Sequence, residues 1–221
     1  MIGLLVDDVG ADNYYHVCNG KPIILTSKIY LVIDLTTSDY NLTEIIKSDS
    51  IGCARIANYS DFTNENLEKA RTLKKLCKRN NIPILLEDNH ELAVKEGFDG
   101  VHLRKPPKNF KEILKLQSLN FFVGVNCAYS KHMGMLMAEA GADYIAFSKG
   151  MNRIITGMEP YDYDLISWWN ETIETPLVVE NSNSIDEIKT LSETCDFISI
   201  SAKKCQDKKY FNKVVSILQK S

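Results

Sequence analysis

Eight short apolar runs rich in β-branched residues recur along the chain, and none of them alternates cleanly between polar and apolar positions. Runs of this kind are typical of β-strands that are buried on both faces, as in a parallel sheet. The expected strands cover residues 29–33, 51–56, 82–86, 100–103, 120–125, 144–147, 176–179 and 197–200.

Segments with helical periodicity lie between most of these runs. Apolar side chains between 67 and 77 fall on one helical face, and Thr63 or Asn64 offers an N-cap for that helix. Ser130 precedes a second such face, and the Ser-x-x-Glu pattern at 184–187 predicts a capping box ahead of a third. The chain therefore alternates between strands and helices.

This alternation predicts a single α/β domain, a (β/α)8 TIM barrel that spans residues 29–221. An open doubly wound sheet is the alternative, but it usually has fewer strands, and no GxGxxG motif follows a strand here. Residues 1–28 precede the barrel as a short N-terminal extension. Its residues 2–6 fit a strand or a short helix equally well.

The composition argues against nucleic acid and membranes as partners of this protein. The 221 residues, 44% of them hydrophobic, suffice for one core, and the net charge of −3 gives no basic footprint for nucleic acid. No apolar run approaches the ~20 residues that a membrane helix needs, and the start of the chain lacks the basic residues of a signal peptide. The six cysteines form no CxxC pair, which favours buried thiols in a reducing compartment. We therefore expect a cytoplasmic protein with small-molecule partners.

In a (β/α)8 barrel the working residues follow the carboxyl ends of the strands. Several basic residues are expected at this rim, and Ser201 with Lys203 and Lys204 is a candidate phosphate site. A solvated basic turn explains these last three residues equally well. The polar and charged side chains and the one thiol at rim positions are Asp34, Arg55, Glu87, Asp88, His102, Arg104, Lys105, Asn126, Cys127, Ser148, Lys149, Glu180, Asn181, Ser182, Ser201, Lys203 and Lys204.

Three of these positions suggest specific chemistry. Asp88, next to Glu87, could hold Mg²⁺ and through it a diphosphate, because this ion prefers oxygen ligands and substrate phosphates. Asp88 could equally serve as the N-cap of the helix that follows it. A single histidine within a strand, such as His102, is usually a packing residue. Cys127 has no histidine near it in sequence that would activate it as a nucleophile.

Several motifs resemble the thiamine phosphate synthase family over about residues 29–220. The stretch 67–102 is similar to the middle of that family and ends in DGVH, as in the family's "aDGVHlGq". Residues 141–144 (GADY) resemble its "GADYig" strand, residues 30–34 its "lYlvtD" strand, and residues 200–202 its "isA" ending.

The resemblance implies a reaction that joins hydroxymethylpyrimidine diphosphate to thiazole phosphate and releases pyrophosphate. The pyrimidine cation is trapped by the thiazole nitrogen, while Mg²⁺ and basic groups stabilise the departing pyrophosphate. The partners implied are phosphorylated small molecules, and a homodimer is left open. Two alternatives remain: a non-catalytic protein that binds a phosphate ligand, and a thiazole tautomerase. The tautomerase would need a histidine near the end of the fifth strand, where only His132 lies close.

Carried over residue by residue, the resemblance is partial. Asp88 matches the family's first Mg²⁺ aspartate and is the implied metal ligand, but Pro107 stands at the second aspartate. Arg55 matches a family arginine, and Lys149 could replace a lysine that the family carries in a loop, so both are assigned catalytic roles. The implied substrate and phosphate ligands are Glu87, His102, Arg104, Lys105, Asn126, Asn181, Ser182, Ile200 and Ser201.

Some of these assigned positions carry a residue that differs from the family's. Glu87 replaces an asparagine, Asn126 replaces a serine, and the "GGi" phosphate turn reads Asn-Ser-Asn at 181–183. Glycines let backbone amides approach a phosphate closely, but asparagine can also adopt the left-handed conformation that such a turn needs.

Overall fold

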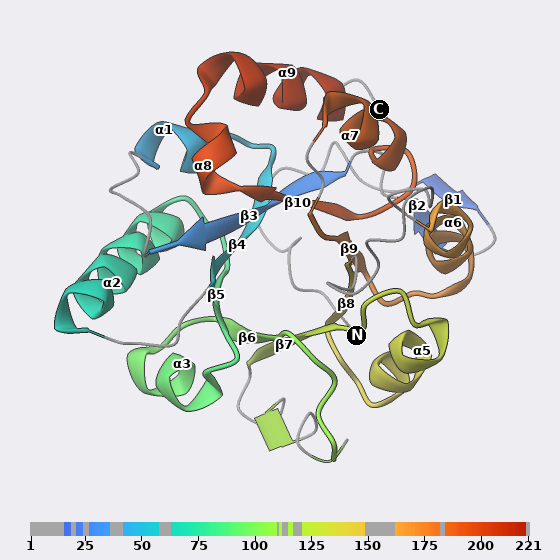
Figure 1. Cartoon of the computed structure of the whole chain (residues 1–221), viewed down its shortest axis with the longest axis horizontal. Helices are drawn as coiled ribbons and strands as arrows, with labels where there is room; N and C mark the ends of the chain where they lie inside the picture. The colour runs from blue at the N-terminus through green and yellow to red at the C-terminus, as the bar shows by residue number, and fades with distance from the viewer. Residues whose placement is uncertain are drawn as a thin grey trace, which may run out of the picture.

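Eight parallel strands close into a barrel in the order β10-β3-β4-β5-β6-β7-β8-β9 (Figure 1). The computed structural model describes residues 16–18, 21–23, 27–35, 42–57, 63–109, 111, 115–116, 121–148, 162–181 and 184–219. The barrel strands are β3 (Lys28–Asp34), β4 (Ile51–Ala57), β5 (Ile84–Glu87), β6 (Gly100–Leu103), β7 (Phe122–Asn126), β8 (Tyr144–Phe147), β9 (Leu177–Val179) and β10 (Phe197–Ser201). The predicted (β/α)8 barrel is thereby confirmed.

Helices surround the barrel on its outer side (Figure 1). They are α1 (Thr43–Ile46), α2 (Asn64–Arg79), α3 (His90–Glu96), α5 (Lys131–Glu139), α6 (Tyr163–Thr172), α7 (Ile185–Leu191), α8 (Ala202–Cys205) and α9 (Lys208–Leu218). The predicted caps are confirmed: the side chains of Thr63 and Ser130 accept hydrogen bonds from backbone amides of α2 and α5. Ser184 and Glu187 form the predicted capping box. No helix in the described ranges is long and apolar enough to cross a membrane.

Before the barrel, the structure describes an antiparallel strand pair, β1 (His16–Cys18) and β2 (Lys21–Ile23). The expected element at residues 2–6 lies outside the described residues. The division into an extension (1–28) and a barrel domain (29–221) stays a prediction.

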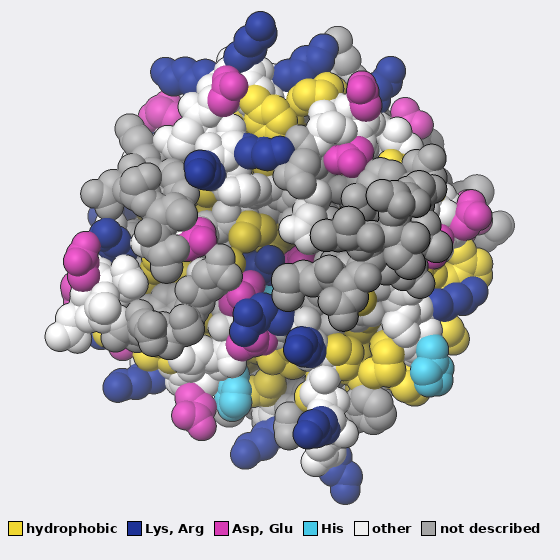
Figure 2. Space-filling model, viewed as in Figure 1, with side chains coloured by type: hydrophobic (Ala, Val, Ile, Leu, Met, Phe, Trp, Pro, Cys, Tyr) yellow, Lys and Arg dark blue, Asp and Glu magenta, His cyan; other side chains and the backbone are white. Residues whose placement is uncertain are grey.

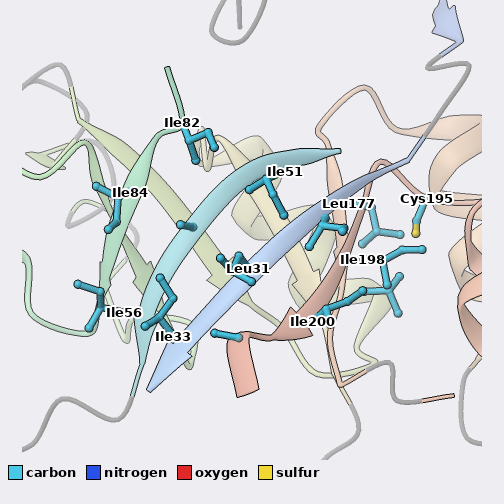
Figure 3. Close-up of a cluster of buried hydrophobic side chains, with 14 of the residues drawn as sticks. Leu31, Ile33, Ile51, Ile56, Ile82, Ile84, Leu177, Cys195, Ile198 and Ile200 are labelled. Atoms are coloured by element: carbon cyan, nitrogen blue, oxygen red, sulfur yellow. The ribbon is translucent and has the colours of Figure 1, made fainter. Parts of the chain in front are cut away.

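The alternation of side chains along the strands divides the core into two layers. Aliphatic side chains such as Leu31, Ile56 and Ile198 belong to the larger cluster, in which the strands pack against the helices (Figure 3). Tyr30, Cys53, Leu85, Tyr144 and Val178 belong to a second cluster, which fills the barrel interior. The five cysteines within the described ranges are free and buried, as expected.

One position inside the barrel requires a glycine. A Cβ atom at Gly124 of β7 would lie 1.8 Å from Cζ of the Tyr144 ring on β8, and a second ring atom would be 2.2 Å away. Any side chain at 124 would therefore displace the Tyr144 ring. The absence of a side chain here leaves room for the Tyr144 ring in the barrel interior.

Candidate functional site

Five buried polar side chains converge where the barrel strands end at their carboxyl termini. They come from β4, β5, β6 and β7 and from the residue after β9, and each is 8% exposed or less. We call them the inner network: Arg55, Glu87, His102, Asn126 and Glu180. On several strands they stand two residues beyond an inward apolar side chain, as Arg55 follows Cys53, and this spacing keeps them on the inner face.

Arg55 is held between two carboxylates. Its Nη1 donates to Glu180 Oε1 at 2.5 Å, and its Nε lies 3.4 Å from Glu87 Oε2. Burial alone would lower the pKa of Arg55, but the Glu180 carboxylate and other neighbours raise it above its ordinary value. Arg55 is therefore a charged group whose charge is balanced within the protein.

Asn126 connects the other side of the inner network. Its Nδ2 donates to Glu180 Oε2 at 2.8 Å and lies 2.9 Å from Ser148 Oγ, and its Oδ1 accepts from the backbone N–H of Ala128 at 2.8 Å. Ala128 adopts a positive φ of 49° in the turn after β7. Asn126 thus holds the carboxylate of Glu180 and the turn after its own strand in a fixed relation.

His102 belongs to a buried row of aromatic side chains. Its Nδ1 lies 2.8 Å from the Tyr144 hydroxyl, which is 2.7 Å from the Tyr30 hydroxyl. Burial, with a contribution from the charge of Arg55, holds the pKa of His102 well below its usual value, and burial raises the pKa of both tyrosines. At neutral pH His102 is therefore uncharged, which fits the predicted packing role better than proton transfer.

A second arrangement, the rim pair, consists of Asp88 and Arg104. Asp88 has a positive φ of 54°, and its backbone N–H donates to the His102 carbonyl at 2.9 Å. Its Oδ1 accepts from the Arg104 backbone N–H at 2.8 Å, and its Oδ2 accepts from Arg104 Nε. The hydrogen bond from Asp88 raises the pKa of Arg104. Figure 2 shows acidic and basic side chains side by side near the centre of one face of the molecule.

The alternative that Asp88 caps α3 is wrong. The N-cap is Asn89, whose side chain accepts from the Leu92 backbone N–H at 3.1 Å. The left-handed backbone at Asp88 turns its carboxylate toward Arg104 and moves the start of the helix one residue along. Asp88 is therefore available to the site.

The residues at the rim do not fit a resident Mg²⁺ ion in this arrangement. Both oxygens of Asp88 already accept hydrogen bonds from Arg104, and Pro107 stands at the second expected ligand. Within the described ranges no group of three or more His, Cys, Asp or Glu side chains could hold a metal ion. The Arg104 guanidinium is thus bound to the Asp88 carboxylate, the group that would otherwise contact the ion.

An open cavity of about 690 Å³ adjoins the rim pair. Its described lining residues include the acidic Asp88 and Glu91, the cations Lys105 and Lys115 and apolar residues such as Leu103, but not Arg104 itself. Small-molecule sites commonly have a volume of this order, with mostly apolar walls and a few polar groups. The structure places the predicted ligand Lys105 in this lining.

The predicted phosphate site after β9 and β10 is described in part. Asn181 adopts a left-handed conformation (φ 64°), and its backbone N–H donates to Ser199 Oγ at 3.1 Å. Ser201 is exposed and its hydroxyl accepts from the Lys203 backbone N–H at 3.3 Å, while Ile200 is buried in the core. Ser182 and Lys149 lie outside the described residues.

Sequence reasoning placed Glu180 and Ser148 at the rim but gave them no role in the site. The structure makes Glu180 the residue that joins Arg55 and Asn126 across the barrel. The available signal was a carboxylate two residues beyond an inward-facing apolar residue, Val178. Cys127 is excluded as an activated nucleophile, because burial raises its pKa to about 12.

Solved structures of known proteins share the fold of this chain. Among solved structures, the thiamine phosphate pyrophosphorylase from Pyrococcus furiosus has a TM-score of 0.67 at 19% identity, covering 87% of this chain and 96% of that one. The 3-hexulose-6-phosphate synthase from Salmonella typhimurium has a TM-score of 0.65 at 16% identity, covering 87% and 99%. At these identities the likeness shows the (β/α)8 fold alone.

Sequence comparison is more specific. The family described as thiamine monophosphate synthase matches residues 29–202. The thiamine-phosphate synthase of Nitrosospira multiformis is 30% identical over 190 residues, covering 83% of this chain and 81% of the relative. That of Rhodospirillum centenum is 27% identical over 165 residues, covering 72% and 78%. The chain therefore belongs to the thiamine monophosphate synthase family, as a divergent member.

Proposed function

We propose that this chain is a working thiamine phosphate synthase that joins hydroxymethylpyrimidine diphosphate to thiazole phosphate and releases pyrophosphate. The observation that carries the proposal is the rim pair, where an exposed guanidinium is anchored on a carboxylate beside an open cavity. Such a cation suits a diphosphate group, because its planar fork of N–H donors matches phosphate oxygens. Family membership supports the type of reaction.

The chemistry of this reaction agrees with the groups present. The bond between the pyrimidine methylene carbon and a diphosphate oxygen breaks, and its electron pair leaves with pyrophosphate. The lone pair of the thiazole nitrogen then forms the new carbon–nitrogen bond. No proton has to be removed before this bond forms, so neither the neutral His102 nor the protonated Cys127 is needed. Arg104 and Lys105 would stabilise the negative charge that develops on the departing group.

Other predicted residues are assigned positioning or phosphate-binding roles. Arg55, predicted to be catalytic, forms ion pairs with Glu87 and Glu180. We therefore assign it the role of positioning these two carboxylates. Asn181 and Ser201 follow β9 and β10, where barrels of this fold commonly bind phosphate, and the thiazole phosphate is assigned to them. The roles of Ser182 and Lys149 stay predictions.

Three further expectations also remain proposals. A cytoplasmic location is supported by the free, buried thiols of the described cysteines. A homodimer stays a prediction without a structural test. A need for Mg²⁺, which the family resemblance implies, is opposed by the hydrogen bonds at Asp88.

A second candidate is a non-catalytic homologue that binds a phosphate ligand. It is favoured by the ion pairs that tie Arg55 to Glu87 and Glu180 and so keep this arginine from a substrate. The thiazole tautomerase receives no such support, since His132, the histidine considered for it, is an exposed residue of α5.

The test is to incubate the purified chain with both substrates in a buffer containing Mg²⁺ and to follow thiamine phosphate by mass spectrometry. In a matched assay with EDTA in place of Mg²⁺, Arg104→Gln should lower turnover by at least about tenfold, because it removes charge stabilisation of the leaving group. Lys108→Gln, which makes the same change of charge at an exposed position of the same segment, should leave turnover unchanged. Absence of product from a folded wild-type chain that still binds either ligand would favour the non-catalytic candidate.

A further inference from the structure

The rim pair is built in a way that a simple surface ion pair is not. Arg104 contacts Asp88 twice, through its backbone N–H and through its side-chain Nε, so that one residue occupies both carboxylate oxygens. Nε also lies 3.5 Å from Glu87 Oε1, which brings a second carboxylate to the same guanidinium. A single cation thus holds two adjacent carboxylates, as a divalent ion does in many phosphate sites.

The remaining donors of Arg104 are available to a ligand. An arginine carries five side-chain N–H groups, and within the described residues only the one on Nε is engaged. Nη1 and Nη2 make no hydrogen bond to the described part of the chain, and the side chain is 60% exposed. Arg55 differs, since its Nη1 is already bonded to Glu180 and its side chain is 7% exposed.

The orientation of Arg104 is fixed before any ligand arrives. The backbone of Asp88 is held by its N–H bond to the His102 carbonyl, and its carboxylate then aligns the guanidinium through Nε. A cation that is oriented in advance loses little conformational freedom on binding, which favours affinity.

We infer that Arg104 replaces the divalent metal ion at this site, so that the chain binds the diphosphate group through the guanidinium without Mg²⁺. This inference rests on the proposed function, because it presumes a diphosphate ligand. It assigns Asp88 as a positioning residue that orients Arg104 instead of a metal ligand. Lys105, which lines the adjoining cavity, adds a second positive charge near the same ligand.

The experiment measures the affinity of the full chain for inorganic pyrophosphate by calorimetry, first in EDTA and then with the Mg²⁺ complex of pyrophosphate. Wild-type affinity should differ by less than about threefold between the two titrants, because the guanidinium supplies the charge in both. Arg104→Gln should lose about 10- to 100-fold in EDTA, the value of the lost charge-assisted hydrogen bonds. It should recover with the Mg²⁺ complex, because Asp88 is then free to bind the ion.

Two further variants make the result specific. The double variant Arg104→Gln/Asp88→Asn should not recover with Mg²⁺, since the freed carboxylate is gone. Lys108→Gln should behave as the wild type in both titrations. Circular dichroism confirms that each variant is folded.

Each outcome separates this inference from the proposed function. Wild-type binding that appears only with Mg²⁺ would overturn the metal replacement and leave the synthase proposal intact, provided that Mg²⁺-dependent turnover is seen. An Arg104→Gln variant that binds pyrophosphate in EDTA as tightly as the wild type would also overturn it. No wild-type binding of either titrant, together with no turnover, would remove both proposals.

Discussion

Two arginines near the same mouth of the barrel, Arg55 and Arg104, differ in how far their side chains are buried. Arg55 has a 7% exposed side chain and is shared between Glu87 and Glu180, whereas the 60% exposed Arg104 is anchored on Asp88. A buried guanidinium must be compensated within the protein because it has lost its water, and the compensating carboxylates hold it in place. An exposed guanidinium keeps donors for a ligand. On this difference in burial we propose a structural role for Arg55 and a ligand-binding role for Arg104.

The comparison predicts its largest effect at Glu180, the main partner of the buried arginine. Glu180→Gln removes the charge that faces Arg55, and breaking one side of a buried ion pair should lower the free energy of unfolding by about 3 kcal/mol. Urea unfolding measures this loss. Glu171→Gln, an exposed charge change on α6, is the control and should have little effect. Equal stability of the two variants would contradict a structural role for Arg55.

A second prediction tests the inner region without changing its charge. Gly124→Ala places a Cβ against the Tyr144 ring, and this overpacking should cost about 2 kcal/mol in urea unfolding. The displaced ring should also lose its contact with His102. In the double variant Gly124→Ala/Tyr144→Leu the clash is relieved. The loss of stability in the double variant should therefore be smaller than the sum of the losses in the two single variants. Strict additivity would show that the ring is not the obstacle.

A third prediction concerns pH. The folded state keeps His102 neutral, while the unfolded chain takes up a proton at this position as the pH falls below about 6.5. The unfolded state then binds more protons, so the stability that is present at neutral pH is lost on acidification. Between about pH 7 and pH 5 the wild type should lose about 1.5 kcal/mol more than His102→Gln. His90→Gln, at an exposed histidine, should follow the wild type; identical pH profiles for all three would refute a buried neutral His102.

The smallest effect on stability is expected at the rim pair. Arg104→Gln should change the free energy of unfolding by less than about 1 kcal/mol, because an exposed ion pair contributes little to folding. Thermal and urea unfolding both measure it. A loss as large as that of Glu180→Gln would place Arg104 with the structural residues and abolish the distinction between the two arginines.

Much of the fold could be predicted from the sequence, because strands buried on both faces leave continuous apolar runs. The predicted strand at 144–147 coincides with β8, and the run at 120–125 was displaced slightly from β7, Phe122–Asn126. Polar residues near or just after the ends of such runs were expected at the rim, and the structure links Arg55 to Glu87 directly and to Asn126 through Glu180.

The pairings within the site could not be predicted, since they depend on the lateral arrangement of distant strands. The contact between Arg55 and Glu180 joins residues 125 positions apart, and no local pattern specifies it. At Asp88 the local pattern was ambiguous, because Asp88 and Asn89 are both good N-cap residues. The left-handed backbone of Asp88 decided between them, and that conformation is uncommon for a residue other than glycine.

The most direct test of the account is the formation of thiamine phosphate by the wild-type chain in EDTA. If the anchored guanidinium of Arg104 takes the place of the metal ion, product should form at a rate within about threefold of that in Mg²⁺. The same chain with Arg104→Gln should then form product only after Mg²⁺ is added. Wild-type turnover that depends strictly on Mg²⁺ would contradict the central claim that the rim pair binds diphosphate without a metal.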